Sequence, residues 1–252
     1  ICMTCHNARR GLRNDDNFAE SDTKSAGRAP HGSAQTDVLM GENAYLVNVG
    51  IRASHSLVED TCVICHMEET PPPDLLSYNL GGTNHTFFAS PDICSNCHGE
   101  LQDADSLQAA FQASSDELQD LVEQAWLEVI GDLTDGGNTI DLIEDDTVVA
   151  TITSAADIEE LIFGETHGRQ GLTVIFTAGT TVGPLRLTDM SVIDGTGATI
   201  GTINEFAADD LIKAGWNWNL ANNDGSKGVH NPPWVFAFLD ASIDAMIALL
   251  GG

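Results

Sequence analysis

The chain has 252 residues, of which 38 are aspartate or glutamate and only 10 are lysine or arginine, so its formal net charge is −28. A surface this acidic repels phosphate, which excludes nucleic acid as an expected partner and argues against adhesion to anionic lipid headgroups. Apolar residues make up 42% of the sequence, enough for a buried core, and no apolar run approaches the roughly 18 residues that would predict a membrane span.

Residues 1–100 are predicted to be an irregular segment that wraps around bound groups. Proline and glycine interrupt it, for example at Pro30 and at Gly81-Gly82, and its hydrophobic periodicity is weak. It opens at Ile1-Cys2 with no initiator methionine and no visible signal peptide, so we expect that an upstream segment was processed or trimmed. Six of the ten basic residues fall in the first 52 positions, and guanidinium groups suit carboxylate partners. These residues are Arg9, Arg10, Arg13, Lys24, Arg28 and Arg52.

All six cysteines occur in three pairs of identical spacing, each followed at once by a histidine. The motifs are Cys2 and Cys5 with His6, Cys62 and Cys65 with His66, and Cys94 and Cys97 with His98. CxxCH is the attachment signature of haem c: two thiols at i and i+3 form thioethers with one porphyrin, and the next histidine can bind the iron. Zinc would need the pairs to act in twos or with distant histidines, and a thioredoxin-like pair usually occurs once. The spacing therefore predicts three haem c cofactors, and the early guanidinium groups are expected to pair with their propionates.

Five histidines lie outside the motifs and are candidates for the opposite face of each iron. Distal ligands are expected at His31, His55, His85 and His230, with His167 as a weak candidate. His55 and His85 lie shortly upstream of a CxxCH motif, while His167 is far from any motif and is better explained as a turn or surface residue. Four good candidates for three irons leave one in excess. The extra histidine would serve a haem on a missing upstream segment or on a neighbouring subunit.

Three further segments follow the motifs. Residues 104–130 are predicted to be a helix that ends at Gly131, and residues 205–252 return to helix after Pro232 and Pro233. Residues 132–204 are predicted to be a small β-rich insert without haem, with a short helix at 154–163. The strands are expected at 139–152, 172–177, 183–187 and 199–203. Carboxylates of this insert could bind calcium, although they lack EF-hand spacing and a solvated acidic face is the alternative; they are Asp141, Glu144, Asp145 and Asp146.

The strings CMTCHNARR, PHGSAQ, DTCVICHM, NHTF and GVHNP resemble those of bacterial and archaeal multihaem cytochromes c. The resemblance covers residues 1–130 and 226–250. The segment at 132–204 resembles no family. Resemblance and residue patterns together give the expected fold: an α plus irregular multihaem cytochrome c domain (1–131) with a small β-rich insert (132–204), a C-terminal helical segment (205–252), and two long helices packing near the haems. The resemblance also implies a location outside the cytoplasm, periplasmic or extracellular.

The expected function is electron transfer through three bis-histidine haems, without enzymatic activity, because a six-coordinate iron has no open position for substrate. Expected partners are redox proteins or an extracellular acceptor. A homo-oligomer or filament is also expected, with a histidine donated across the subunit interface. The alternative is a subunit of a nitrite- or hydroxylamine-type reductase with one open iron.

Overall fold

The computed structural model describes residues 2–11, 15–48, 50–67, 69–70, 82–83, 87, 89, 91–98 and 104–251. The N-terminal part consists of short elements joined by loops. Its helices are α1 (Cys2–Cys5), α2 (Asp22–Ser25), α3 (Gln35–Met40), α4 (Cys62–His66) and α5 (Pro91–His98), with short 3-10 turns at Phe18–Glu20 and Ser54–Leu57. The two-residue strands β1 (Glu69–Thr70) and β2 (Gly82–Thr83) pair antiparallel.

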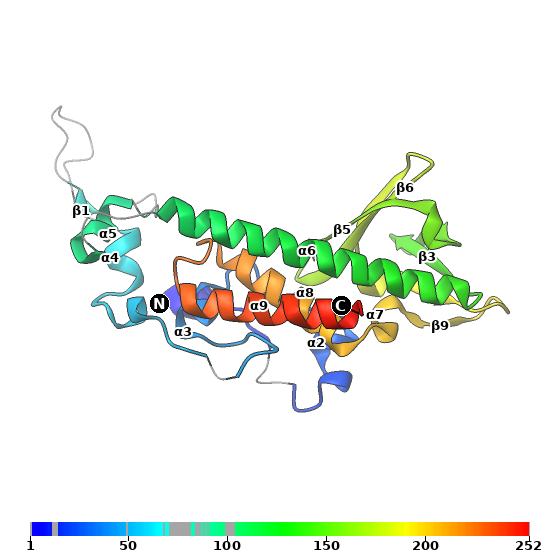
Figure 1. Ribbon diagram of the computed structural model, residues 1–252, viewed down its shortest axis with the longest axis horizontal. Helices are drawn as coiled ribbons and strands as arrows, with labels where there is room; N and C mark the ends of the chain where they lie inside the picture. Colours follow the sequence, from blue (N-terminus) through cyan, green and yellow to red (C-terminus); the bar gives the residue numbers. More distant parts are fainter. Residues whose placement is uncertain are drawn as a thin grey trace.

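Helix α6 (Ala104–Asp135) has 32 residues and runs along the length of the molecule, from the CxxCH segments at one end to the sheets at the other (Figure 1). It is longer than the predicted segment because Gly131 lies inside the helix. The stop is Gly136-Gly137, where Gly137 takes the left-handed conformation with φ 83°, which glycine adopts at little cost.

Three helices follow near the C-terminus: α7 (Ile203–Phe206), α8 (Asp209–Asp224) and α9 (Pro232–Leu249). Helices α8 and α9 pack beside α6, whereas α7 contacts α2, β8 and β9. Helix α8 ends at Gly225 in the left-handed conformation with φ 71°, and α9 begins with two prolines, which a first helical turn accommodates. Asn231, at the start of α9, donates side-chain hydrogen bonds to the carbonyls of Val38 and Ile51. The loop between α8 and α9 is therefore tied to the N-terminal part of the chain.

The β region forms two antiparallel sheets. The four-stranded sheet has the order β4-β3-β8-β9 and the three-stranded sheet the order β5-β6-β7. The strands are β3 (Thr139–Glu144), β4 (Thr147–Ile152), β5 (Ile158–Thr166), β6 (Arg169–Phe176), β7 (Thr181–Arg186), β8 (Met190–Ile193) and β9 (Thr199–Thr202). Tight turns with positive φ join β3 to β4 at Asp145-Asp146 and β5 to β6 at His167-Gly168.

The predicted helix at 154–163 is wrong. A short 3-10 turn at Ala155–Asp157 leads directly into strand β5, which pairs with β6 from Ile158 to Thr166. Along β5, Leu161 and Phe163 are buried while Glu160 and Ile162 are exposed, which is the alternation of a strand rather than the period of a helix. The side chain of Ser154 accepts from the amide of Ala156, so it caps the 3-10 turn and not a helix.

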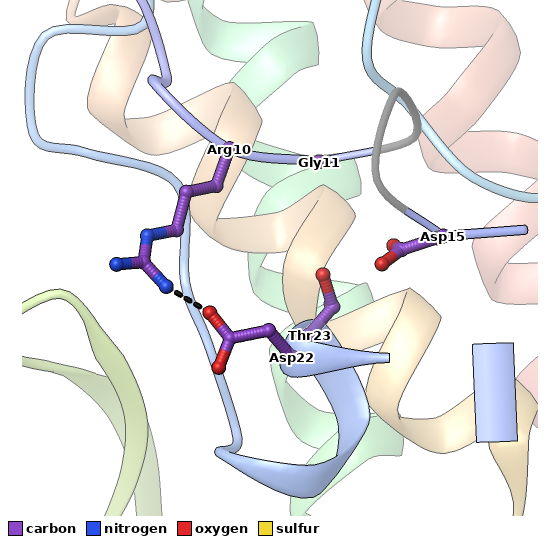
Figure 2. A pocket seen from close by; sticks show the side chains of 5 residues that line it. All are labelled: Arg10, Gly11, Asp15, Asp22 and Thr23. Atoms are coloured by element: carbon purple, nitrogen blue, oxygen red, sulfur yellow. Dashed lines mark hydrogen bonds and ion pairs between the residues drawn. The ribbon is translucent and has the colours of Figure 1, made fainter. Parts of the chain in front are cut away.

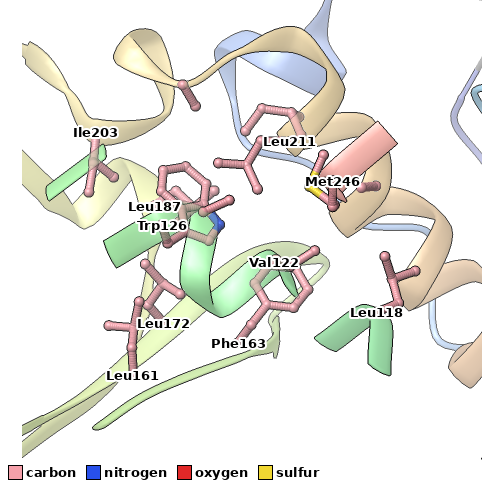
Figure 3. Close-up of a cluster of buried hydrophobic side chains, with 14 of the residues drawn as sticks. Leu118, Val122, Trp126, Leu161, Phe163, Leu172, Leu187, Ile203, Leu211 and Met246 are labelled. Carbon is pink, nitrogen blue, oxygen red and sulfur yellow. The ribbon is translucent and has the colours of Figure 1, made fainter. Parts of the chain in front are cut away.

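One hydrophobic cluster joins the helices to both sheets. Figure 3 shows Val122 and Trp126 of α6 facing Leu161 and Phe163 of β5 and Leu172 of β6. Residues of α8 and α9, such as Leu211 and Met246, belong to the same cluster and are fully buried. Trp126 and Trp216 are the largest side chains with no exposed surface.

The predicted fold class is therefore wrong. The described residues form a mixed α/β fold with nine α-helices and, apart from the β1–β2 pair, seven strands in two antiparallel sheets. They do not form an irregular helical cytochrome domain carrying a small insert. The physical reason is the shared core: apolar residues of β3, β5 and β6 bury against α6, so the sheets are part of the main packing unit. A sequence pattern shows which residues alternate, but not against what they pack.

By length and composition, α9 could cross a membrane, since its 18 residues have a mean hydropathy of 1.3. Within the described part of the chain this helix packs against α6 and α8, and 39% of it is buried. A core helix of a soluble protein meets the same criterion, so composition alone does not distinguish the two environments.

Candidate functional site

The three CxxCH motifs lie on short helices. The first occupies α1, the second α4 and the third the C-terminal half of α5. Residues three apart on a helix share one face, so the two thiols of each motif project side by side. Attachment to the two vinyl groups of one porphyrin requires such a pair of thiols.

The six cysteines differ in exposure. None forms a disulfide; Cys2, Cys5 and Cys97 are exposed, and Cys62, Cys65 and Cys94 are half-buried. Cys65, which is predicted to form a thioether, lies half-buried on α4. That role stays a prediction, as it does for the other five cysteines. It is compatible with the geometry, since no thiol of the three motifs is fully buried.

Two of the motifs lie against each other. Partial burial raises the pKa of the Cys62 thiol, and the nearby Cys2 thiol raises it further. These cysteines are far apart in the sequence, and they belong to α4 and α1. The fold thus brings the first and second motifs together, which is the arrangement that closely spaced cofactors would need.

Two motif histidines each face an imidazole from outside the motifs. The ring centres of His98 and His55 are 5.8 Å apart with their planes at 81°, and those of His66 and His230 are 6.1 Å apart with planes at 59°. Metal–imidazole bonds are about 2 Å long, so two imidazoles on opposite sides of one metal have ring centres roughly 6 Å apart. Both spacings fit an iron between the rings.

In three histidines of these two groups, the motif histidines and the expected distal ligands, Nδ1 is already engaged in a hydrogen bond with an oxygen that can only accept. His6 donates to Oε1 of Gln35 (3.0 Å), His66 to the carbonyl of Phe87 (2.8 Å) and His230 to Oδ1 of Asp224 (2.6 Å). A carbonyl or carboxylate oxygen can only accept, so the proton sits on Nδ1 and the lone pair on Nε2. The Nε2 atoms are therefore available to a metal, and the Nδ1 partners fix the ring orientations.

The remaining candidates are placed differently. His31 donates its backbone N–H to the carbonyl of Ala8, two residues after His6, and its buried Nδ1 has no hydrogen-bond partner in the described part of the chain. A buried ring nitrogen without a hydrogen-bond partner is unusual in a folded protein, and a metal bound there would give it a partner.

His85 lies outside the described residues. His167 occupies the β5–β6 turn with φ 53° and contacts Thr166, away from the three motifs in sequence. Its left-handed backbone gives it a structural role in the hairpin.

Sequence reasoning missed Gln35 and Asp224. Neither belongs to a CxxCH motif. Gln35 is the last residue of the PHGSAQ string, and Asp224 precedes Gly225 in the helix-ending string before His230. Asp224 is the last residue of α8, and its side chain is 0% exposed. A carboxylate buried to that degree requires partners, which here are the His230 ring and the Ser226 hydroxyl and amide.

The early basic residues are largely engaged within the protein. Arg10 and Arg28 both contact Asp22, Lys24 pairs with Asp209, and Arg52 donates to Ser56. Arg13 lies outside the described residues. To pair with haem propionates, as predicted, these side chains would have to break the contacts that they make within the protein.

A small cavity of about 270 Å³ lies next to the Arg10–Asp22 pair, and Figure 2 shows Asp15 and Thr23 on its wall. Burial raises the pKa of Asp15, although hydrogen bonds with Thr23 and Ser21 counteract this. Substrate pockets usually measure about 300–1,000 Å³ and are mostly apolar in their lining. This cavity is below that range of volumes, so it is no candidate for an organic substrate.

No three histidine, cysteine or acidic side chains gather around one point in the described ranges. Haem does not require such a cluster, because the porphyrin supplies four ligands and the protein at most two. Calcium does require one, and Asp141 instead accepts a hydrogen bond from Thr151 across the β3–β4 hairpin. No family model, curated protein or solved structure matches this chain.

Proposed function

We propose that this chain binds three haem c groups and transfers electrons between them. The observation that carries the proposal is the pair of facing imidazoles, His55–His98 and His66–His230, each with one member in a CxxCH motif. When bound, haem supplies a one-electron ferric/ferrous couple. The residues of the chain attach it, hold both axial positions and exclude other ligands.

The facing rings support one assignment of the iron ligands. His6, His66 and His98 bind the irons from one side. His55 serves the iron of the third motif, and His230 serves that of the second.

The thioethers follow from the motifs. Cys62 and Cys65 attach the haem that lies between His66 and His230, Cys94 and Cys97 the haem of the third motif, and Cys2 and Cys5 the haem of the first. His31 and His85 remain for the iron of the first motif, so one of the two is in excess. The excess histidine would bind a haem of a neighbouring subunit, in an oligomer or filament of this chain.

The experiment is to express the chain in a host that attaches haem outside the cytoplasm and to count the haems by pyridine haemochrome and intact mass. Three haems per chain are expected. The matched control is the double substitution Cys94→Ser and Cys97→Ser, which should lose one haem and leave the other two. A wild-type chain without covalent haem would refute the proposal.

One observation favours the alternative function, a reductase with one open iron. Within the described ranges, no imidazole faces His6 at a distance that fits an iron; its Nδ1 contacts Gln35 instead. An open iron at the first motif would bind cyanide or nitrite. Adding either anion to the oxidised protein should leave the spectrum unchanged if the protein is a pure carrier, and should shift one haem if it is a reductase.

A further inference from the structure

Two proposed iron ligands, His6 of the first motif and His230 from outside the motifs, are held by one hydrogen-bonded unit. Gln35, the first residue of α3, accepts from His6 through Oε1 and donates through Nε2 to the carbonyl of Asp224 (2.9 Å) and, more weakly, of Asn223 (3.3 Å). Asp224 accepts in turn from His230. We refer to Gln35 and Asp224 as the Gln35–Asp224 bracket. It joins the start of α3 to the end of α8.

The two ends of the bracket differ in charge. His6 is held by a neutral amide at 3.0 Å, while His230 is held by a buried carboxylate at 2.6 Å. Hydrogen bonds to charged acceptors are shorter and about twice as strong as neutral ones. The carboxylate therefore pulls the Nδ1 proton of His230 more strongly than the amide pulls that of His6, and makes Nε2 of His230 the better electron donor.

We propose that Asp224 is a positioning residue that lowers the reduction potential of one haem, the one bound between His66 and His230. This inference rests on the proposed function. Ferric haem carries one more positive charge than ferrous haem. A more basic axial imidazole, backed by a carboxylate of low exposure, stabilises the ferric form selectively. The haem at His6, backed only by Gln35, lacks this stabilisation.

This assignment makes the reduction potentials of the haems unequal. His66, on the other side of the same iron, donates only to a backbone carbonyl, so the charged contribution comes from Asp224 alone. No lysine or arginine contacts the Asp224 carboxylate in the described part of the chain; its partners are His230 and Ser226. Its charge is therefore directed at the imidazole and is not neutralised by a cation.

The test is a redox titration of the three haems followed by optical spectroscopy, in the wild-type protein and in Asp224→Asn. Asparagine keeps an acceptor for His230 and removes the charge. Outer-sphere partners of metal ligands change affinity by about 10–100-fold, and a tenfold change in ferric over ferrous preference is about 59 mV for a one-electron couple. One midpoint potential should rise by about 59 mV or more, and the other two should stay in place.

Two variants control for charge and for structure. Asp240→Asn on the exposed side of α9 removes one charge elsewhere and should shift no single haem. Asp224→Glu keeps the charge and should hold the potential near the wild-type value. Unchanged potentials in Asp224→Asn, or an equal shift of all three haems, would overturn this inference and leave the proposed function standing. A wild-type chain without haem would overturn the proposed function together with the inference.

Discussion

His230 connects three parts of the molecule at a single side chain. Its ring faces His66 of α4, its Nδ1 contacts Asp224 of α8, and its backbone N–H donates to Ser226. An imidazole held this way cannot swing away from its partner ring without breaking a buried ionic hydrogen bond. The ring of His167 is not held in this way, because the position of His167 is set by a hairpin turn.

The first prediction concerns this ligand. Replacing His230 with alanine should leave three haems attached, because the thioethers are untouched, and should open one iron. Electron paramagnetic resonance of the oxidised variant should show one low-spin haem converted to high spin, and added imidazole should reverse the change. His167→Ala is the control and should leave the spectrum as in the wild type. An entirely low-spin His230→Ala protein would show that His230 is not a ligand.

Glu123 provides a prediction of pH dependence. Burial raises the pKa of this carboxyl, although the amide of Phe163 and the side chain of Gln119 donate to it. A folded-state pKa above the unfolded one favours folding while the group is protonated, and this contribution is lost as pH rises through the folded pKa. Wild type should therefore lose stability relative to Glu123→Gln from the ordinary glutamate range upward. Denaturant unfolding at several pH values measures the difference; equal pH profiles would contradict it.

At the residue level, the sequence predicts those site residues that are marked by their immediate neighbours in the chain. CxxCH is a contiguous pattern, and the positions of His55 and His230 stood out from their flanking residues. The pairing of His55 with the third motif and of His230 with the second depends on contacts between residues far apart in the chain. No local pattern encodes such contacts, and the same holds for the Gln35–Asp224 bracket.

Among the elements, α6 links the motif end of the molecule to the sheets. Trp126 lies in its C-terminal half and is fully buried between α6, the strands and the C-terminal helices (Figure 3). Its indole N–H has no hydrogen-bond partner in the described part of the chain. Its contribution is therefore one of packing.

The prediction for this element is that Trp126→Ala lowers the free energy of unfolding by about 3–5 kcal/mol, the usual cost of such a cavity. Trp126→Phe should cost much less, because it keeps an aromatic ring and removes an unsatisfied donor. Guanidinium unfolding of both variants gives the comparison. A small loss in Trp126→Ala would mean that α6 is not packed as described.

The elements also show where sequence patterns reach their limit. Strands β6, β7 and β9 lie in or overlap the predicted ranges, whereas the single range predicted at 139–152 is a hairpin of β3 and β4 that turns at Asp145-Asp146, and β8 was not predicted. The segment at 158–163 was predicted to be helix, and its two adjacent glutamates have good helix propensity. Pairing with β6 along eight registered residue pairs overrides that preference.

For the whole molecule, the shared core decides whether the β region is dispensable. Leu161, Phe163 and Leu172 cover α6 residues that would otherwise be exposed to water. A detachable insert would leave an intact core behind when removed. The described packing does not allow this.

The corresponding prediction is that replacing residues 139–202 with a short glycine-serine linker abolishes cooperative unfolding. The loss follows because each buried Leu or Phe side chain contributes about 1.5–3 kcal/mol, which exceeds the net stability of a typical domain after only a few are lost. Circular dichroism and limited proteolysis measure it. A compact, protease-resistant product with three haems would restore the view of the β region as an insert.

The most direct test of the three-haem account is low-temperature electron paramagnetic resonance of the oxidised protein, combined with a pyridine haemochrome count. The account predicts three haems per chain and low-spin ferric signals for at least the two irons that lie between His55 and His98 and between His66 and His230. High-spin signals from two or more irons, or a chain without covalent haem, would contradict it.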